Sequence, residues 1–135
     1  MAVDSSCIDG DTHVGGHKKI WRVGKCLIGF CGEITGALGF VNWYKNGADC
    51  DETYPWGSQF EALVVCPDGS MKMYDGHSQI PIQLSKREKY IALGSGLDVA
   101  LGCMYMGGTA VDAIKVAVKH NVNTKGPVRS YKMKG

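Results

Sequence analysis

The chain has 135 residues, of which 44% are hydrophobic and 21% charged, and its formal net charge is +2 at pH 7. This length suits one domain with its own core, and so small a net charge argues against nucleic acid as a partner. No apolar run approaches the roughly 18 residues that span a bilayer, and the first residues do not resemble a signal peptide. We therefore expect a single cytosolic domain over residues 1–135 that contacts neither membrane nor nucleic acid.

Hydrophobic periodicity and turn residues predict strands grouped in hairpins, with helices between them. Such an order is typical of a layered α+β fold. Thr109 is the predicted N-cap of the last helix, with Asp112 as its acidic partner. The predicted elements are, in chain order, a strand at 2–6, a polar turn region at 9–16, paired strands at 19–23 and 25–31, a helix at 33–47, a loop at 46–58, paired strands at 60–66 and 71–74, a strand at 80–84, helices at 97–106 and 109–120, and a strand at 127–133.

The six cysteines do not form a pattern that is typical of a metal site or of a disulfide-rich secreted domain. Free cysteine is a common small core residue, and without a secretory signal we expect reduced thiols. Cys7, His13 and His17 could be imagined as zinc ligands, but the Val-Gly-Gly sequence between the histidines is a poor helix. We expect no metal and no cofactor. Three cysteines lie in apolar segments: Cys26, Cys31 and Cys66.

Four segments carry a resemblance to a known family. They are Ala-Val-Asp-Ser-Ser at 2–6, Gly-His-Lys-Lys-Ile-Trp-Arg-Val-Gly at 16–24, Ile-Gly-Phe-Cys-Gly at 28–32 and Leu-Gly-Ser-Gly-Leu-Asp-Val-Ala-Leu-Gly at 93–102. In this order and spacing they resemble the proteasome β-subunit and HslV peptidase family, in particular its short phage-type members. The resemblance implies an Ntn-hydrolase sandwich, in which helices flank two stacked antiparallel sheets.

The same resemblance implies a threonine-type peptidase that acts on peptides or unfolded proteins. It implies a homo-oligomeric ring in the cytosol of a bacterium or an infected host cell. An ATP-driven unfoldase, if one docks, would be a separate chain, because this sequence contains no Walker motif. The alternative hypothesis is a non-catalytic ring-forming structural or interaction module, encoded by a phage.

Members of this family use an N-terminal threonine, whose hydroxyl attacks the peptide carbonyl while its own amine moves the proton. The resemblance implies that Asp4 pairs with Lys19, the lysine that lowers the proton affinity of the nucleophile. Gly32 would donate its N–H to the oxyanion, and Ser95 would complete the hydrogen-bond network. The alternatives are a surface aspartate, a solvated lysine, a turn glycine at 32 and a phosphate-binding Gly-Ser-Gly turn around Ser95.

Two departures from the family pattern argue against activity. Asn121 stands where the family usually has an acid, and an amide can form hydrogen bonds but carries no charge. The family threonine lies about a dozen residues upstream of the position that Asp4 matches, whereas only Met1 precedes Ala2 in this sequence. We expect the chain as written to lack the nucleophile and to be inactive.

Overall fold

The computed structural model describes residues 1–4, 6–9, 12–49, 59–121 and 124–133, without the side chains of 6–9 and 12–16. The predicted hairpins and the three predicted helices are confirmed, with ends that shift by at most two residues. Most of the predicted 46–58 loop lies outside the described residues. The elements are β1 (Ala2–Val3), β2 (Ser6–Asp9), β3 (Thr12–Gly16), β4 (Ile20–Val23), β5 (Cys26–Gly32), α1 (Ile34–Lys45), β6 (Phe60–Val65), β7 (Met71–Asp75), β8 (Ile82–Gln83), α2 (Leu97–Tyr105), α3 (Ala110–His120) and β9 (Arg129–Ser130).

The N-terminal region differs from the prediction. Instead of one strand at 2–6, β1 covers Ala2–Val3 and a separate strand, β2, covers Ser6–Asp9. Most of the region expected to be a polar turn forms β3, which pairs antiparallel with β2. The sequence of β3 contains two β-branched residues, Thr12 and Val14, but it ends in two glycines, which are unfavourable in a strand. Backbone pairing with β2 therefore decides its conformation, and strand propensity depends on such context.

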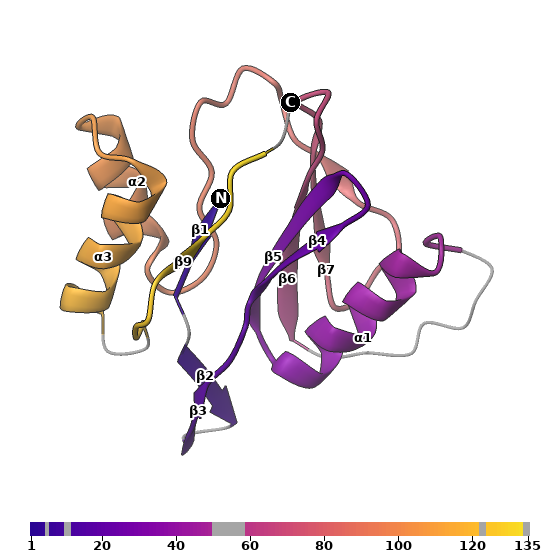
Figure 1. Ribbon diagram of the computed structural model, residues 1–135, viewed down its shortest axis with the longest axis horizontal. Coiled ribbons are helices and arrows are strands. Elements are labelled where there is room, and N and C mark those ends of the chain that lie inside the picture. Colours follow the sequence, from indigo (N-terminus) through magenta and orange to yellow (C-terminus); the bar gives the residue numbers. More distant parts are fainter. Residues whose placement is uncertain (5, 10–11, 50–58, 122–123, 134–135) are drawn as a thin grey trace.

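The elements form layers, as Figure 1 shows. Helices α2 and α3 lie on one side, and the short β1–β9 pair comes next. A five-stranded antiparallel sheet of order β4-β5-β6-β7-β8 follows, and α1 covers its far face. This arrangement confirms the α+β class and the expected sandwich of antiparallel sheets flanked by helices. None of the helices in the described part of the chain is long and apolar enough to cross a membrane.

The main core lies between the five-stranded sheet and α1. Because side chains alternate between the faces of a strand, Ile28 and Phe30 of β5 point toward α1 together with their neighbours on β6. Phe40 of α1 is 0% exposed and packs against the rings of Phe60 and Tyr74. The opposite face of the sheet, which includes Leu27, Gly29 and Cys31 of β5, is turned toward β1 and the α2–α3 pair.

The last helix begins as its sequence predicts. The Thr109 hydroxyl accepts a hydrogen bond from the backbone N–H of Asp112, and the Asp112 carboxylate accepts one from the backbone N–H of Thr109. These bonds from Thr109 lower the pKa of the Asp112 carboxyl. The two residues form a reciprocal capping box, which sets the start of α3 and of the helical layer that faces the sheet.

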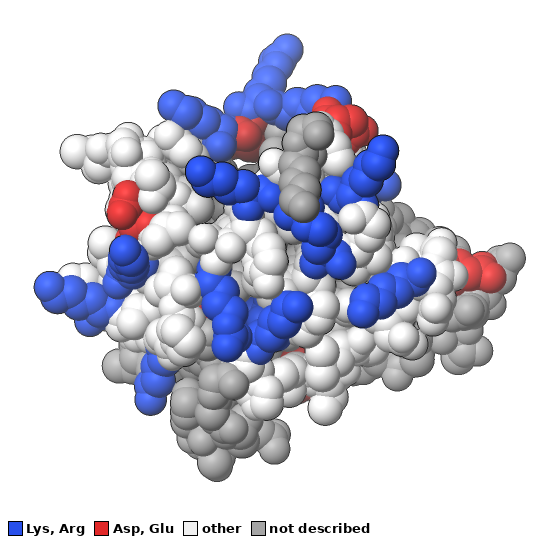
Figure 2. Space-filling model, viewed as in Figure 1, with Lys and Arg blue, Asp and Glu red and all other residues white. Residues whose placement is uncertain are grey.

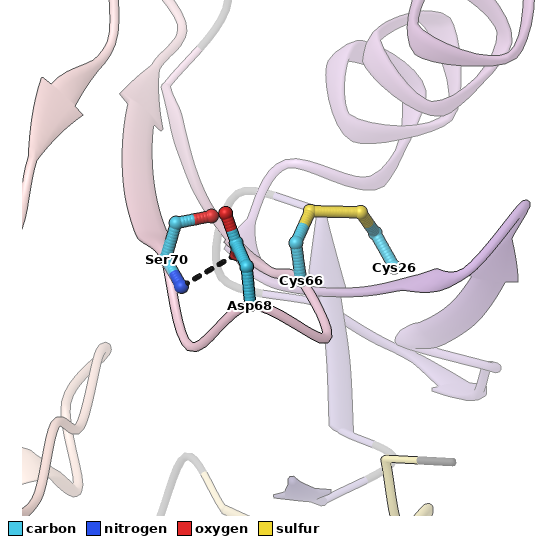
Figure 3. The surroundings of a disulfide bond; sticks show 4 residues. All are labelled: Cys26, Cys66, Asp68 and Ser70. Atoms are coloured by element: carbon cyan, nitrogen blue, oxygen red, sulfur yellow. Dashed lines mark hydrogen bonds between the residues drawn. A yellow bond between two sulfur atoms is a disulfide. The ribbon is translucent and has the colours of Figure 1, made fainter. Parts of the chain in front are cut away.

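The expectation of reduced thiols is wrong for one pair, because Cys26 and Cys66 form a disulfide (Figure 3). Cys26 begins β5 and Cys66 directly follows β6, so antiparallel pairing places their Cα atoms 4.3 Å apart. Directly opposed residues of a non-hydrogen-bonded pair come about this close in any antiparallel ladder. Sequence spacing gave no sign of the bridge, since 40 positions separate the two cysteines.

Removing this disulfide should lower the free energy of unfolding by about 2 kcal/mol. We place the effect at the lower end of the usual range because the ladder already holds β5 against β6. Chemical denaturation of the oxidised protein and of the Cys26→Ala/Cys66→Ala variant measures the difference. Cys103→Ala is the matched control, because Cys103 is a free and half-buried thiol. Equal stability of the oxidised protein and the double variant would show that the bridge adds nothing.

Candidate active site

The structure pairs Lys19 with Asp4. The Lys19 Nζ lies 2.9 Å from the Asp4 Oδ1, and Lys19 is 7% exposed. The second carboxylate oxygen of Asp4 accepts a hydrogen bond of 3.2 Å from the backbone N–H of Lys125. Lys19 directly precedes β4 and Asp4 directly follows β1, so the ion pair joins two sheets. A buried charge requires such partners, and this pair leaves a fixed positive charge beside the inner face of the larger sheet.

Gly32 ends β5 in a conformation that only glycine adopts easily, with φ at +96°. A Cβ atom at this position would lie 2.4 Å from the Gln59 carbonyl oxygen and 2.8 Å from the Phe60 Cα. The backbone of β6 therefore runs directly against Gly32, and the chain turns there toward α1. The position suits a backbone donor, but the oxyanion role of Gly32 stays a prediction.

Ser95 lies in the Gly94-Ser95-Gly96 turn before α2, where hydrogen bonds connect it with Asn121 at the C-cap of α3. The Ser95 hydroxyl donates to the Asn121 Oδ1 over 3.3 Å, and the Asn121 Nδ2 donates to the Ser95 carbonyl over 3.0 Å. The buried Thr124 hydroxyl also donates to the Asn121 Oδ1, over 3.2 Å. These contacts fix the turn that presents Ser95.

All four predicted supporting residues line one cavity of about 990 Å³ between the five-stranded sheet and the α2–α3 pair. Its wall on the sheet side is largely apolar, with Leu27 and Leu63 among the side chains. Its lining contains the four residues that the resemblance singled out: Asp4, Lys19, Gly32 and Ser95. Further ionisable side chains in the lining are those of Glu33, Glu61, Asp75 and His77. The structure thus brings together residues that are up to 91 positions apart in the sequence (from 4 to 95).

Cys31 was missed as a residue of this cavity, because its apolar neighbours indicated a core thiol. Its side chain lies on the inner face of β5, and its Sγ is 3.9 Å from the Glu61 Oε2. Burial, and after it the negative charge of Glu61, raises the pKa of the Cys31 thiol to about 11. The thiol is therefore protonated at neutral pH, which makes it a poor nucleophile. Its position directly before Gly32 was the one sequence signal that could have placed it here.

Among the described strands, β1 pairs only with β9. Met1 and Tyr131 exchange two backbone hydrogen bonds of 2.9 Å, which makes them a hydrogen-bonded pair of the β1–β9 ladder. Ala2 is opposite Ser130, in the next pair of this register, so its N–H and C=O point away from β9. Ala2 lines the cavity, and no other described strand pairs with β1 on that side.

The described residues contain no candidate metal site. No group of three or more His, Cys, Asp or Glu side chains there is arranged to hold a metal ion. The side chains of Cys7 and His13 lie outside what is described. Figure 2 shows lysine and arginine side chains in separate groups across one face rather than in one continuous stripe.

Several solved structures have the same fold as this chain, among them BPH and HslV. BPH from Thiobacillus denitrificans, solved in complex with epoxomicin, superposes with a TM-score of 0.73 at 20% identity, over 99% of this chain and 92% of that one. Eukaryotic HslV from Trypanosoma brucei superposes with a TM-score of 0.70 at 16% sequence identity, over 95% of this chain and 88% of the HslV chain. The chain has the proteasome- and HslV-like Ntn-hydrolase fold.

Further solved relatives of this Ntn-hydrolase fold are more distant. Anbu, the ancestral beta-subunit, from Yersinia bercovieri gives a TM-score of 0.63 at 11% identity, over 94% of this chain and 74% of that one. Anbu from Pseudomonas aeruginosa is described as a helical assembly. No protein-family model and no curated protein matches the chain. At these identities the likeness establishes the Ntn-hydrolase fold alone.

Proposed function

We propose that this chain is the body of a threonine-type peptidase, which hydrolyses peptide bonds with an N-terminal nucleophile. The 135 residues supply the supporting groups of the site but not the threonine. Asp4, Lys19, Gly32 and Ser95 form that support, and the nucleophile belongs to a strand that adds to the free edge of β1. In this proposal the protein acts on peptides or unfolded proteins as a homo-oligomer of ring type, and an ATPase unfoldase is a separate chain.

The observation that carries this proposal is the position of the free edge of β1. The N–H and C=O of Ala2 point away from β9. Ala2 lines the same cavity as the Lys19–Asp4 pair and the apolar side chains of Leu27 and Leu63. Unpaired backbone groups beside an apolar wall are a template for one more strand. Such a strand would bury the apolar wall and would carry its end residue toward Lys19.

In the proposed mechanism, Lys19, Gly32 and Ser95 would assist an incoming hydroxyl nucleophile. The ammonium group of Lys19, held by Asp4, is a positive charge that favours the deprotonated hydroxyl and the anion that forms on attack. The backbone at Gly32 and the fixed Ser95 turn would place further donors around the reacting carbonyl. Cys31 takes no part as a nucleophile, because its thiol is protonated at neutral pH.

Extending the chain should create activity. A protein that begins with threonine, followed by about a dozen residues of strand-type alternation and a glycine turn before Met1, is expected to cleave fluorogenic peptides. Its rate should exceed that of the 135-residue chain by roughly 10³-fold or more, because the nucleophile is supplied. Epoxomicin, the compound bound in the T. denitrificans structure, should inhibit it.

The matched control is the same extended protein with alanine in place of the first threonine. We expect that control to fold and to be inactive. If the extended protein folds with a filled cavity but does not cleave peptides, the peptidase proposal fails and the non-catalytic module becomes the better hypothesis. Peptide cleavage by the 135-residue chain itself, unaffected by Asp4→Ala and Lys19→Ala, would also contradict the site assignment.

A further inference from the structure

Both the oxygen and the nitrogen of the Asn121 side-chain amide form hydrogen bonds. Its oxygen accepts from the hydroxyls of Ser95 and Thr124, and its nitrogen donates to the Ser95 carbonyl over 3.0 Å. A carboxylate has acceptors only, so it could keep the two hydroxyl bonds but not the bond to the carbonyl. Two oxygens with partial or full negative charge would then face each other across the Ser95 turn.

The segment that begins at Asn121 also supports the other half of the site. Thr124 donates back to Asn121, and the backbone N–H of the next residue, Lys125, donates to the Asp4 carboxylate. Asp4 in turn holds Lys19. Asn121 therefore lies where the turn that carries Ser95 and the segment that holds the Asp4–Lys19 pair meet.

We propose that Asn121 is a positioning residue and that its neutral amide is required in this chain. The amide holds the Ser95 turn and the 124–125 segment in one arrangement, which the acid usual at this position of the family would disrupt. The expected effect on catalysis rests on the proposed function. The expected effect on stability does not, because it is measured by unfolding of the 135-residue chain.

The substitution Asn121→Asp separates a structural loss from a loss that depends on charge. A protonated carboxyl can imitate the amide, because its O–H can donate to the Ser95 carbonyl while its C=O accepts from the hydroxyls. The pKa of the new carboxyl should therefore be raised above about 3.9 in the folded protein. The folded state then binds more protons than the unfolded state, so the stability of the variant falls as the pH rises through this range.

Other charged groups on the surrounding elements also have to be considered. Lys19 and Asp4 are already paired with each other. The C-terminus of α3 disfavours a new negative charge, whereas neighbouring cations favour it. Every variant is therefore compared with the unmodified chain at the same pH. The charged or titratable residues that lie close in sequence to Ser95 or Asn121 are Asp98 on α2, Lys119 and His120 on α3, and Lys125 after α3.

The first test is thermal unfolding of the 135-residue chain at about pH 4 and about pH 7. We expect Asn121→Asp to lower the Tm by roughly 3–5 °C at pH 7 and by about 1 °C or less at pH 4. Asn121→Ala, the matched control, should lower the Tm by a similar amount at both pH values, because alanine has neither donor nor acceptor. An aspartate variant as stable as the unmodified chain at pH 7, or one with the same deficit at both pH values, would overturn the inference.

The second test uses the threonine-extended protein. We expect Asn121→Asp to lower kcat about tenfold at neutral pH with little change in KM, and to regain activity relative to the unmodified extended protein as the pH falls. An aspartate variant with equal or higher kcat at neutral pH would show that the acid is tolerated. If no extended protein cleaves peptides, the proposed function fails, and the unfolding experiment still decides the role of Asn121.

Discussion

Replacing Lys19 with methionine should lower the free energy of unfolding by about 3 kcal/mol. Methionine keeps most of the buried stem of the side chain but leaves the Asp4 carboxylate without its cation, 2.9 Å from where the ammonium was. We place the loss at the lower end for a broken buried pair, because Asp4 retains the hydrogen bond from the Lys125 N–H and some exposure to solvent. Urea denaturation at neutral pH measures the difference.

Two further variants test whether the loss of stability comes from the unpaired Asp4 carboxylate. The double variant Lys19→Met/Asp4→Asn removes both charges, so it should recover most of the lost stability if the damage comes from an unpaired carboxylate. Lys18→Met is the matched control, because Lys18 is exposed and its Nζ lies 5.5 Å from the centre of the Trp21 ring. It should change stability by less than about 1 kcal/mol. Equal losses of stability in Lys18→Met and Lys19→Met would show that the Lys19–Asp4 pair contributes no more to stability than an exposed lysine does.

Replacing Gly32 with alanine should destabilise the chain by at least about 3 kcal/mol. The residue has φ at +96°, and the added Cβ would lie within 3.0 Å of two backbone atoms, the Gln59 oxygen and the Phe60 Cα. Neither atom can rotate away as the end of a side chain could, so β5 and β6 would have to separate at this point. Denaturant unfolding of the variant tests the expected loss.

Gly102→Ala provides the control for this substitution. Gly102 lies within α2, and a Cβ there would meet nothing within 4 Å. Alanine favours a helix interior over glycine, so this variant should gain up to about 1 kcal/mol. A Gly32→Ala variant that unfolds at the same denaturant concentration as the unmodified chain would contradict the described contact between Gly32 and β6.

Local patterns predicted most of the elements correctly. Gly24 and the Pro-Asp-Gly turn at 67–69 mark hairpins, because these residues favour the turn conformations that the flanking strands require. The capping box of Thr109 and Asp112 marks the start of α3, since both partners lie within one helical turn. Signals of this kind act over a few residues, so a single sequence can reveal them.

Long-range pairing explains where the sequence prediction was wrong or incomplete. The Cys26–Cys66 bridge depends on the register of β5 with β6, which no local pattern specifies. Strand β3 is a local exception: only two positions separate it from β2, and its pairing with β2 outweighs the turn signals of its own residues. Cys31 reads as a core thiol along the chain, and only the face on which it lies brings it into the cavity.

The sequence by itself determined the hairpins, the three helices and, through its family resemblance, the sandwich and the residues worth examining. The resemblance also implied the Asp4–Lys19 pair, which the structure shows with 2.9 Å between the Lys19 Nζ and the Asp4 Oδ1. The tertiary structure alone decided that the Ser95 turn is hydrogen-bonded to Asn121 and that Ala2 of β1 lines the same cavity as the predicted site residues. The physical reason is that turns and caps depend on neighbouring residues. Ion pairs, strand edges and cavities depend instead on distances between elements that are far apart in the chain, and these distances exist only once the layers have packed.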